Sequence, residues 1–276
     1  METAVILGAG QMGRAAAAAM NENGAVLMAF GDNTRRGEIS GVAVMSIEDA
    51  IGLKPDMAII AVAGEERARD LERQATGCGF GGRIVKLPEL MKYVDIRKAA
   101  FLRLVRRLAG IDGAVAELGV YRGDFAAVIQ KSFPDRKLYL FDTFEGFDPK
   151  DTEKEASGGL SKAKPGDFKD TSSDAVRRRL GGKAIIRKGY FPETCAGIDD
   201  MFAFVSLDAD LFEPTLAGLE WFYERMVPGG AILLHDWDNP RFGGVAAAVD
   251  EYEKRHGILP LVPIGDMHGS AVVIKR

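Results

Sequence analysis

Residues 114–124, AVAELGVYRGD, decide the fold class of most of the chain. The apolar run Ala114–Leu118 has the length and composition of a buried strand. Gly119 and Gly123 then bracket a tight loop that leads into a helical pattern, and a second apolar strand follows at 137–141. A strand, a glycine turn, a helix and another strand in this order predict an α/β unit built on a parallel sheet.

The same alternation continues to the end of the sequence. The patterns predict strands at 184–187, 202–207, 230–234, 261–263 and 271–274, and helices at about 214–226 and 242–256. The last two strands are short and flank a glycine-containing turn, which predicts an antiparallel pair at the edge of the sheet. Residues 148–173 lack apolar density and are rich in Lys, Asp, Gly and Ser. They predict a long loop, either a lid over a ligand or a disordered segment.

A separate α/β unit occupies the N-terminal third. GAGQMG supplies Gly8, Gly10 and Gly13 between a strand and an alanine-rich helix. That context is typical of a dinucleotide fingerprint, in which the glycines let the backbone approach a pyrophosphate. Asp32 lies where a ribose-binding acid is expected. A nucleotide or NAD is therefore the candidate ligand, and a Rossmann fold used only for packing or assembly is the alternative.

The organisation predicted is two doubly wound, Rossmann-like parallel-sheet units. We expect a small domain over residues 1–90, a linking helix over 91–110 and a larger domain over 111–276. Composition is 47% hydrophobic and 28% charged, as in globular proteins. The net charge of −4 argues against a nucleic-acid partner, and no apolar run reaches membrane-spanning length.

Cysteine usage bears on the compartment. Cys78 and Cys195 lie far apart and show no metal-binding spacing, which favours a reducing environment. We therefore expect a cytoplasmic protein. Whether the chain forms a homo-oligomer is left open by the sequence.

Acidic residues end the first two strands of the larger unit. Glu117 lies where it can meet a cationic amine, and the Asp142 carboxylate suits a ribose diol because it can accept from both hydroxyls. This arrangement resembles the S-adenosylmethionine site of class I methyltransferases. The donor-binding candidates on that resemblance are Glu117, Gly119, Tyr121, Gly123, Asp142 and Thr143.

Four further segments extend the resemblance: LFDTFEGF (140–147), KGYFPETC (188–195), SLDADLFEPTLAGLEWFYERMVPGGAILLHDW (206–237) and VAAAVDEYEKRHGI (245–258). With them, residues 98–276 resemble the macrocin O-methyltransferase family of sugar O-methyltransferases from antibiotic and polysaccharide pathways. The resemblance implies a class I methyltransferase fold with an antiparallel C-terminal strand pair, S-adenosylmethionine as donor and a sugar-containing small molecule as acceptor. It does not cover residues 1–90.

Acids also follow two later strands: Asp208 and Asp210 after the strand at 202–207, and Asp236 after the next. In the family that the chain resembles, a divalent metal, usually magnesium, holds two neighbouring sugar hydroxyls at this place. The match implies Asp208 and Asp236 as metal ligands and Asp210 as the general base. Hard oxygen ligands suit magnesium, and a metal lowers the pKa of a bound hydroxyl.

His235 departs from the family pattern, which has Asp-Asp-Tyr where this chain has His-Asp-Trp. If His235 is a ligand, a nitrogen enters the metal shell and the preference moves toward manganese, iron or zinc. Otherwise His235 packs or acts as a catalytic base, and Asp238 completes the shell. Magnesium is the metal expected, with manganese as the alternative.

Two other interpretations compete with this site. Asp208 or Asp210 could cap the helix that Pro214 opens, although three acids at neighbouring strand ends favour a ligand site. The chain as a whole could be a nucleotide-binding regulatory or assembly protein with an inactive methyltransferase half. An NAD-dependent oxidoreductase is disfavoured because the first unit lacks plausible hydride-site residues. Candidates to stack on a sugar are Phe147, Phe191 and Trp237.

Overall fold

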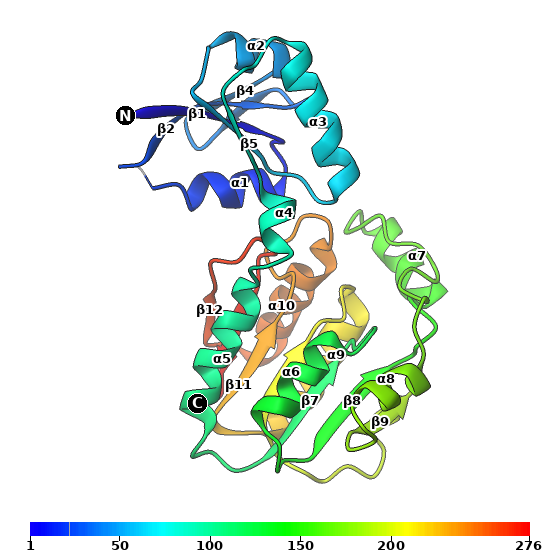
Figure 1. Cartoon of the computed structure of the whole chain (residues 1–276). Helices are drawn as coiled ribbons and strands as arrows, with labels where there is room; N and C mark the ends of the chain where they lie inside the picture. Colours follow the sequence, from blue (N-terminus) through cyan, green and yellow to red (C-terminus); the bar gives the residue numbers. More distant parts are fainter. Residues whose placement is uncertain (22) are drawn as a thin grey trace. The chain divides into compact units, whose positions relative to one another are not determined.

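The chain folds as two compact α/β units. The computed structural model describes residues 1–21 and 23–276. The first unit comprises Met1–Ile96 with Gly265–Met267, and the second comprises Arg97–Ile264 with His268–Arg276. Each unit contains one mostly parallel sheet flanked by helices (Figure 1). The fold class predicted from the sequence is confirmed.

The first unit has a six-stranded sheet in the order β3-β4-β2-β1-β5-β6, parallel except for β3. Its elements are β1 (Glu2–Leu7), α1 (Gln11–Ala18), β2 (Ala25–Gly31), β3 (Gly37–Ile39), β4 (Val42–Met45), α2 (Ile47–Gly52), β5 (Met57–Ile60), α3 (Glu65–Gly77), β6 (Arg83–Lys86) and α4 (Leu87–Met91). Successive side chains of β1 point to opposite faces: Val5 and Leu7 join one apolar cluster and Ile6 the other. Both faces of the sheet are therefore buried, as expected for parallel strands.

The second unit has a seven-stranded sheet in the order β12-β13-β11-β10-β7-β8-β9. Its elements are α5 (Ile96–Leu108), β7 (Ala114–Leu118), α6 (Asp124–Ser132), β8 (Leu138–Asp142), α7 (Pro149–Ser157), α8 (Ser173–Arg179), β9 (Ile185–Lys188), a 3₁₀ turn (Glu193–Cys195), β10 (Phe202–Leu207), α9 (Phe212–Arg225), β11 (Met226–Leu234), α10 (Gly243–His256), β12 (Leu261–Pro263) and β13 (Ala271–Ile274). Strand β13 runs antiparallel to both its neighbours, as the C-terminal strand pair predicted.

Apolar side chains cover both faces of this sheet as well. Phe204 of β10 packs in the cluster that holds Phe101 and Phe125, whereas the adjacent Val205 packs against α9 and α10 residues in the other cluster. Fully buried strands leave only their ends open to solvent. Ligand chemistry in such a sheet is therefore expected where the strands end.

Two segments differ from the sequence prediction. Residues 148–173, predicted as a long loop, contain the helix α7, which begins after Asp148 caps it and which buries Asp151 and Glu155. Of the helix predicted over 91–110, the structure has α5 at Ile96–Leu108, which packs into the second unit through Phe101, and the short helix α4 ends at Met91 before it. Within the described residues, no helix combines the length and apolarity needed to cross a bilayer.

Candidate active site

Strand register brings the predicted acids together. Leu207 of β10 pairs with Leu118 of β7 on one side and with Leu234 of β11 on the other, all in parallel. The backbone N–H of Asp208 therefore donates to Leu118 (2.8 Å), and that of His235 donates to Leu207 (2.9 Å). The residues that follow these strands emerge at one edge of the sheet.

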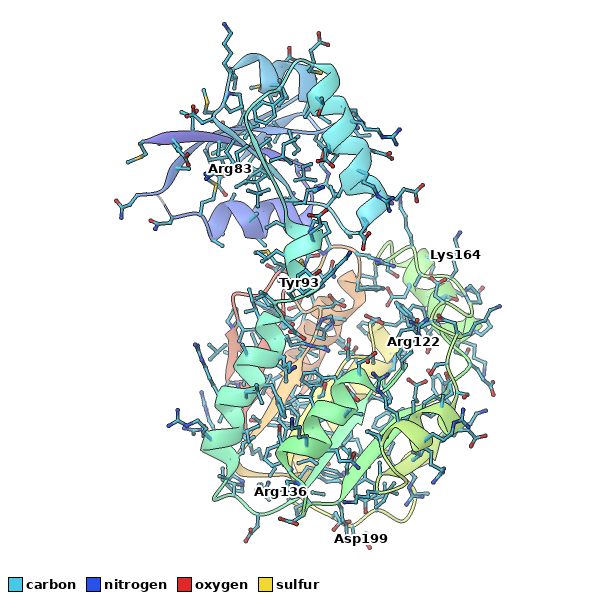
Figure 2. All side chains as sticks on the ribbon, viewed as in Figure 1. Arg83, Tyr93, Arg122, Arg136, Lys164 and Asp199 are labelled. Carbon is cyan, nitrogen blue, oxygen red and sulfur yellow. The ribbon has the colours of Figure 1, made fainter. Side chains whose placement is uncertain are left out.

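Figure 2 locates this edge. Arg122, in the turn after β7, lies beyond the carboxyl ends of the parallel strands, whereas Arg136 and Asp199 lie at the opposite edge. The predicted acids at 208, 210 and 236 all follow the carboxyl ends of their strands. The candidate site thus occupies the edge where open α/β sheets bind ligands.

Four side chains form a compact polar cluster. Asp208, Asp210, His235 and Asp236 each offer a ligand atom, and these atoms all lie within 4.8 Å of one another. His235 Nδ1 is 3.0 Å from Asp208 Oδ1 and 2.9 Å from Asp236 Oδ2. Three carboxyl groups and an imidazole are a donor set that fits a divalent cation.

Backbone strain aims two of these carboxyl groups. Asp210 and Asp236 both have positive φ, 61° and 56°, a left-handed conformation that is uncommon for residues other than glycine. Such strain persists where the surrounding structure imposes it, often at functional sites. Asn239 holds Asp236 in place by donating its side-chain N–H to Asp236 Oδ1.

Asp208 is held as an anion. Burial alone would raise its pKa, but the positive charges of His235 and Arg97 and the hydrogen bonds from both hold the pKa of Asp208 well below its usual range. Arg97 Nη1 lies 2.7 Å from Asp208 Oδ2. The Arg97 guanidinium also rests over the Phe125 ring, 4.4 Å from its centroid, which fixes its direction. Arg97 comes from α5, 111 residues away in sequence, and no local pattern identified it.

The pKa values of His235 and Asp210 are both raised by their surroundings. Burial opposes protonation of His235, yet the adjacent Asp208 carboxylate raises the pKa of the imidazole to about 10. Burial, together with the charges of Asp208 and Asp236, raises the pKa of Asp210 well above its usual range. The cluster thus favours the protonated forms of Asp210 and His235 and the ionised form of Asp208.

Glu117 is an ionisable group buried at the end of β7. Only 1% of it is exposed, and its Oε2 atom has no hydrogen-bond partner among the described residues. Burial raises the pKa of Glu117 well above its usual range. A buried carboxyl oxygen without a partner is costly unless something binds it, and a cationic amine would suit it because a nearby positive charge favours the ionised carboxylate.

The glycine turn after β7 is shaped by the neighbouring strand. A Cβ added at Gly119, where φ is +84°, would lie 1.9 Å from the carbonyl oxygen of Asp208. Gly123 has φ +75° and precedes α6. Gly119 therefore allows the close approach of the two strand ends that carry Glu117 and Asp208.

Asp142 holds the same turn from the adjacent strand. Its Oδ2 accepts from the backbone N–H groups of Val120 and Tyr121, both at 2.8 Å, and its Oδ1 accepts from Phe144 at 2.6 Å. The carboxylate predicted to bind a ribose thus already accepts three backbone hydrogen bonds. Thr143, also predicted to bind the donor, donates to the carbonyl oxygen of Gly146 (2.9 Å).

Tyr121 connects the turn to the segment after α7. Its hydroxyl donates to Asp170 (2.8 Å), and its ring meets Phe168 edge to face, with centroids 5.4 Å apart. Thr171 donates its hydroxyl to the carbonyl oxygen of Tyr121. The segment around 168–171 is therefore docked on the glycine turn rather than disordered.

Helix α7 also settles the capping alternative. Glu155 Oε1 accepts from the backbone N–H of Phe212 at the start of α9, at 2.7 Å. The residue before α9 provides no side-chain cap, and Asp208 is ion-paired with Arg97 and His235 instead. Glu155 supplies the hydrogen bond to the start of α9 that the capping interpretation assigned to Asp208 or Asp210. Only the tertiary contact between α7 and α9 reveals this.

The three aromatic residues predicted to stack on a sugar differ in burial. Phe191 is only 4% exposed and stacks on Phe222 in the core, so it cannot stack on a sugar without unpacking. Phe147 and Trp237 are partly buried and pack against the same core cluster. Of the three, these two retain exposed surface.

The first unit uses its predicted residues mainly for its own packing. A Cβ at Gly13 would lie 1.9 Å from the carbonyl oxygen of Gly8, and a Cβ at Gly8 would meet Ala61 at 2.7 Å. Gly10 differs, because its φ is −79° and nothing lies within 4 Å of an added Cβ. Asp32 Oδ2 accepts from the N–H of Ala9 at 2.8 Å, as Asp142 does for its own turn.

Comparison with known proteins adds an independent finding. The family model described as Macrocin-O-methyltransferase (TylF) matches residues 98–276. A mycinamicin III 3''-O-methyltransferase from Micromonospora griseorubida is 30% identical over 165 residues, which cover 54% of this chain and 63% of that protein. An 8-demethyl-8-(2,3-dimethoxy-alpha-L-rhamnosyl)-tetracenomycin-C 4'-O-methyltransferase from Streptomyces olivaceus is 26% identical over 176 residues, covering 59% and 66%. The chain thus spans less than two thirds of the length of these curated relatives.

Solved structures support the fold. The O-methyltransferase NovP aligns with a TM-score of 0.54 at 20% identity, covering 65% of this chain and 79% of that one. CalS11, a calicheamicin methyltransferase, aligns with the same TM-score at 18% identity, covering 77% and 94%. The family match spans well over half of the residues and includes the strand ends that carry the acid cluster. The chain belongs to the macrocin-O-methyltransferase (TylF) family.

Proposed function

We propose that this chain is a divalent-metal- and S-adenosylmethionine-dependent O-methyltransferase that acts on a sugar hydroxyl of a glycoside or nucleotide sugar. One observation carries the proposal: ligand atoms of three carboxyl groups and an imidazole, from two adjacent strand ends, lie within 4.8 Å of one another beside the strand that carries Glu117. Family membership and the two relatives whose names specify O-methyl transfer support it.

The donor would bind over the glycine turn after β7. Glu117 Oε2, buried and without a partner among the described residues, would accept from the donor's ammonium group. Asp142 accepts from the backbone N–H groups of Val120 and Tyr121 and so fixes the turn over which the donor would lie. Tyr121 and the docked 168–171 segment would exclude water from this side.

The acceptor would bind beside the acid cluster, with Asp208 and Asp236 as the carboxylates that hold the cation. A bound divalent cation would lower the pKa of the sugar hydroxyl and offset the repulsion among these carboxylates. Asp210 would accept the hydroxyl proton as the oxygen–methyl bond forms and the methyl–sulfur bond breaks. The left-handed backbone of Asp210, with φ 61°, would present its carboxyl group to the acceptor beside Asp208 and Asp236.

The test is methyl transfer from labelled S-adenosylmethionine to a panel of deoxysugar glycosides and nucleotide sugars, with and without chelator. Asp208→Asn should abolish transfer while leaving donor affinity within about threefold, because Asp208 lies on the acceptor side. Asp135→Asn, an exposed acid at the opposite edge of the sheet, is the matched control. Full activity in chelator would reject the metal role, and full activity of Asp208→Asn would reject the site.

A second candidate function, nucleotide binding by the first unit, has one observation in its favour. Internal packing explains Gly8 and Gly13, but neither packing nor backbone conformation requires glycine at position 10. A phosphate that approaches the backbone there would require it. Gly10→Ala should leave the stability of the first unit within about 0.5 kcal/mol. Calorimetry of the full chain with NAD and nucleotide sugars should show binding that this variant loses, and equal binding by both would refute the assignment.

A further inference from the structure

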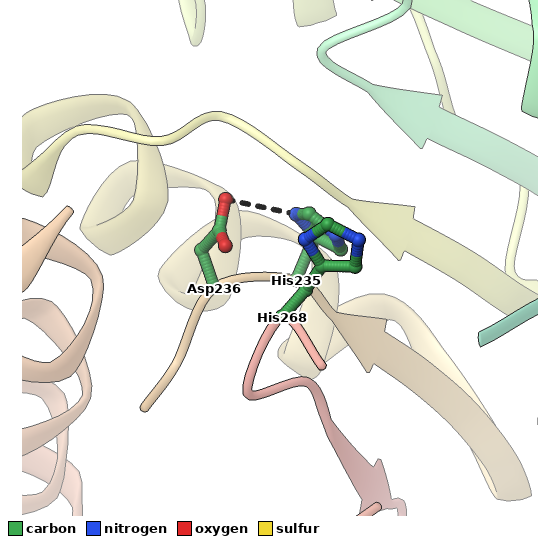
Figure 3. Close-up of side chains that lie close together, drawn as sticks. All are labelled: His235, Asp236 and His268. Carbon is green, nitrogen blue, oxygen red and sulfur yellow. Dashed lines mark hydrogen bonds and ion pairs between the residues drawn. The ribbon is translucent and has the colours of Figure 1, made fainter. Parts of the chain in front are cut away.

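His268 is the one cluster member that neither the sequence patterns nor the family match pointed to. Its ring nitrogen, a ring nitrogen of His235 and a carboxylate oxygen of Asp236 lie within 4.8 Å of one another. Figure 3 shows the two imidazoles side by side, with His268 on the turn that precedes β13 and the Asp236 carboxylate next to His235. The ring centroids of the two histidines are 5.3 Å apart. His235 and Asp236 are therefore shared between the acid cluster and a second group of potential ligands.

The position of His268 is built into the sheet. Strand β13 pairs antiparallel with β11, and Ala271 lies opposite Leu234. Residues just before Ala271 must consequently lie beside those just after Leu234. The N–H of Asp238 donates to the carbonyl oxygen of Gly269 at 2.9 Å, which ties the two turns together.

Gly269 permits this close contact. Its φ is +74°, and a Cβ there would lie 2.7 Å from the Asp238 backbone. A larger residue at 269 would push the turn away and move His268 with it. The turn is therefore held in register by backbone contacts that do not depend on the histidine.

The spacing within this group is close to that of a metal shell. Ligand atoms about 2.1 Å from an octahedral cation lie about 3.0 Å apart when adjacent and about 4.2 Å apart when opposite. His235 Nδ1 lies 2.9 Å from Asp236 Oδ2, the pair joined by the dashed line in Figure 3. The 4.8 Å limit on the whole group leaves room for one ion after small side-chain rotations.

We infer that His268 is a metal ligand, and that His235, Asp236 and His268 bind a transition-metal cation such as Mn²⁺, Fe²⁺ or Co²⁺ in preference to Mg²⁺. Imidazole nitrogen suits these cations, whereas Mg²⁺ favours an all-oxygen shell and keeps its waters. The inference rests on the proposed function for the presence of a cation. It concerns ligands and metal class, which binding measurements can test without any turnover.

The chain has three histidines, which makes the experiment sharp. Metal-free full-length protein is titrated with Mn²⁺, and binding is followed by loss of the free-ion electron paramagnetic resonance signal. Pulsed resonance on the bound ion then detects ¹⁴N coupling from imidazole. The third histidine, His256, is exposed at the end of α10, with its Nε2 atom 3.4 Å from Glu220 Oε1. His256→Gln is therefore the matched control.

Wild type and His256→Gln should show two coupled nitrogens and the same Mn²⁺ affinity. His268→Gln should lose one coupling and bind Mn²⁺ at least tenfold more weakly, since even residues behind metal ligands change affinity by about 10–100-fold. His268→Asp should lose the same coupling yet gain affinity for Mg²⁺ relative to Mn²⁺, which shows that the site is intact. Absence of ¹⁴N coupling in wild type, or an unchanged spectrum in His268→Gln, would overturn the inference.

The two proposals fail separately. Nitrogen-coupled Mn²⁺ in a protein that methylates no sugar would support His268 as a ligand and count against the proposed function. Sugar methylation supported by Mg²⁺, with no nitrogen coupling to bound Mn²⁺, would support the function and overturn the ligand assignment.

Discussion

Replacement of Gly119 by alanine tests whether the glycine turn after β7 and the cluster of Asp208, Asp210, His235 and Asp236 pack as one unit. The added methyl would lie 1.9 Å from the Asp208 carbonyl oxygen, whereas Cβ contacts under 3.0 Å are essentially never seen. The two strand ends must therefore separate by about 1.1 Å, the difference between those values. That movement strains the hydrogen bond from Asp208 N–H to Leu118, which is 2.8 Å long.

The expected cost has two parts. Alanine at φ +84° costs about 1–2 kcal/mol for the left-handed conformation, and overpacking a tight contact adds about 1–3 kcal/mol. The total of about 2–5 kcal/mol is a large fraction of the stability of a typical domain. For a unit of this size it corresponds to a fall in melting temperature on the order of 10 °C.

Tryptophan fluorescence in urea is the assay, because Trp221 and Trp237 both lie in the second unit and report its unfolding. Gly182→Ala is the control: its φ is +75°, but nothing lies within 4 Å of an added Cβ. It should lose only the conformational part, about 1–2 kcal/mol. Because Gly119→Ala displaces the backbone of Asp208, it should also weaken Mn²⁺ binding. Equal destabilisation by the two variants, or undiminished Mn²⁺ affinity in Gly119→Ala, would refute the reasoning.

Three further outcomes are expected. Burial raises the pKa of Glu117, so the folded protein keeps a proton that the unfolded chain releases above about pH 4.5. The free energy of unfolding should therefore fall as pH rises from 4.5 toward the folded pKa. Glu117→Gln should reduce the difference between the urea midpoints measured at about pH 5 and pH 8. Asp32 is partly buried, which opposes ionisation, but backbone hydrogen bonds lower its pKa. Its contribution to the free energy of unfolding should be present above pH 3.8 and lost as pH falls through the folded pKa. Asp32→Asn should lower the free energy of unfolding by about 1–3 kcal/mol at neutral pH, measured as faster hydrogen exchange at the Ala9 N–H. Tyr190 donates to the buried Asp151 of α7 at 2.7 Å, so Tyr190→Phe should speed proteolysis within α7 and leave the urea midpoint of the first unit unchanged.

The sequence located the acid cluster because the acids directly follow apolar strands. Parallel strands end at one edge of a sheet, and from this rule alone we expected Asp208, Asp210 and Asp236 to lie together. The register of β10 with β11 agrees with that expectation. The roles given to these acids stay predictions. The long loop expected at 148–173 was wrong at 149–157, where the charged, small-residue composition concealed α7, which is anchored by the buried Asp151 and Glu155. Residues 158–172 do form a loop.

By itself, then, the sequence determined the two α/β units and the edge of the sheet where chemistry is expected, because hydrophobic alternation and glycine turns are local properties of the chain. The tertiary structure alone decided which side chains complete that edge. Arg97 reaches Asp208 from a helix 111 residues earlier, and His268 arrives through an antiparallel strand at the end of the chain. Contacts between distant residues depend on how helices and strands pack, and no local pattern records them. The charge state of the cluster follows from the same packing, since burial and neighbouring charges set the pKa values of Asp210 and His235.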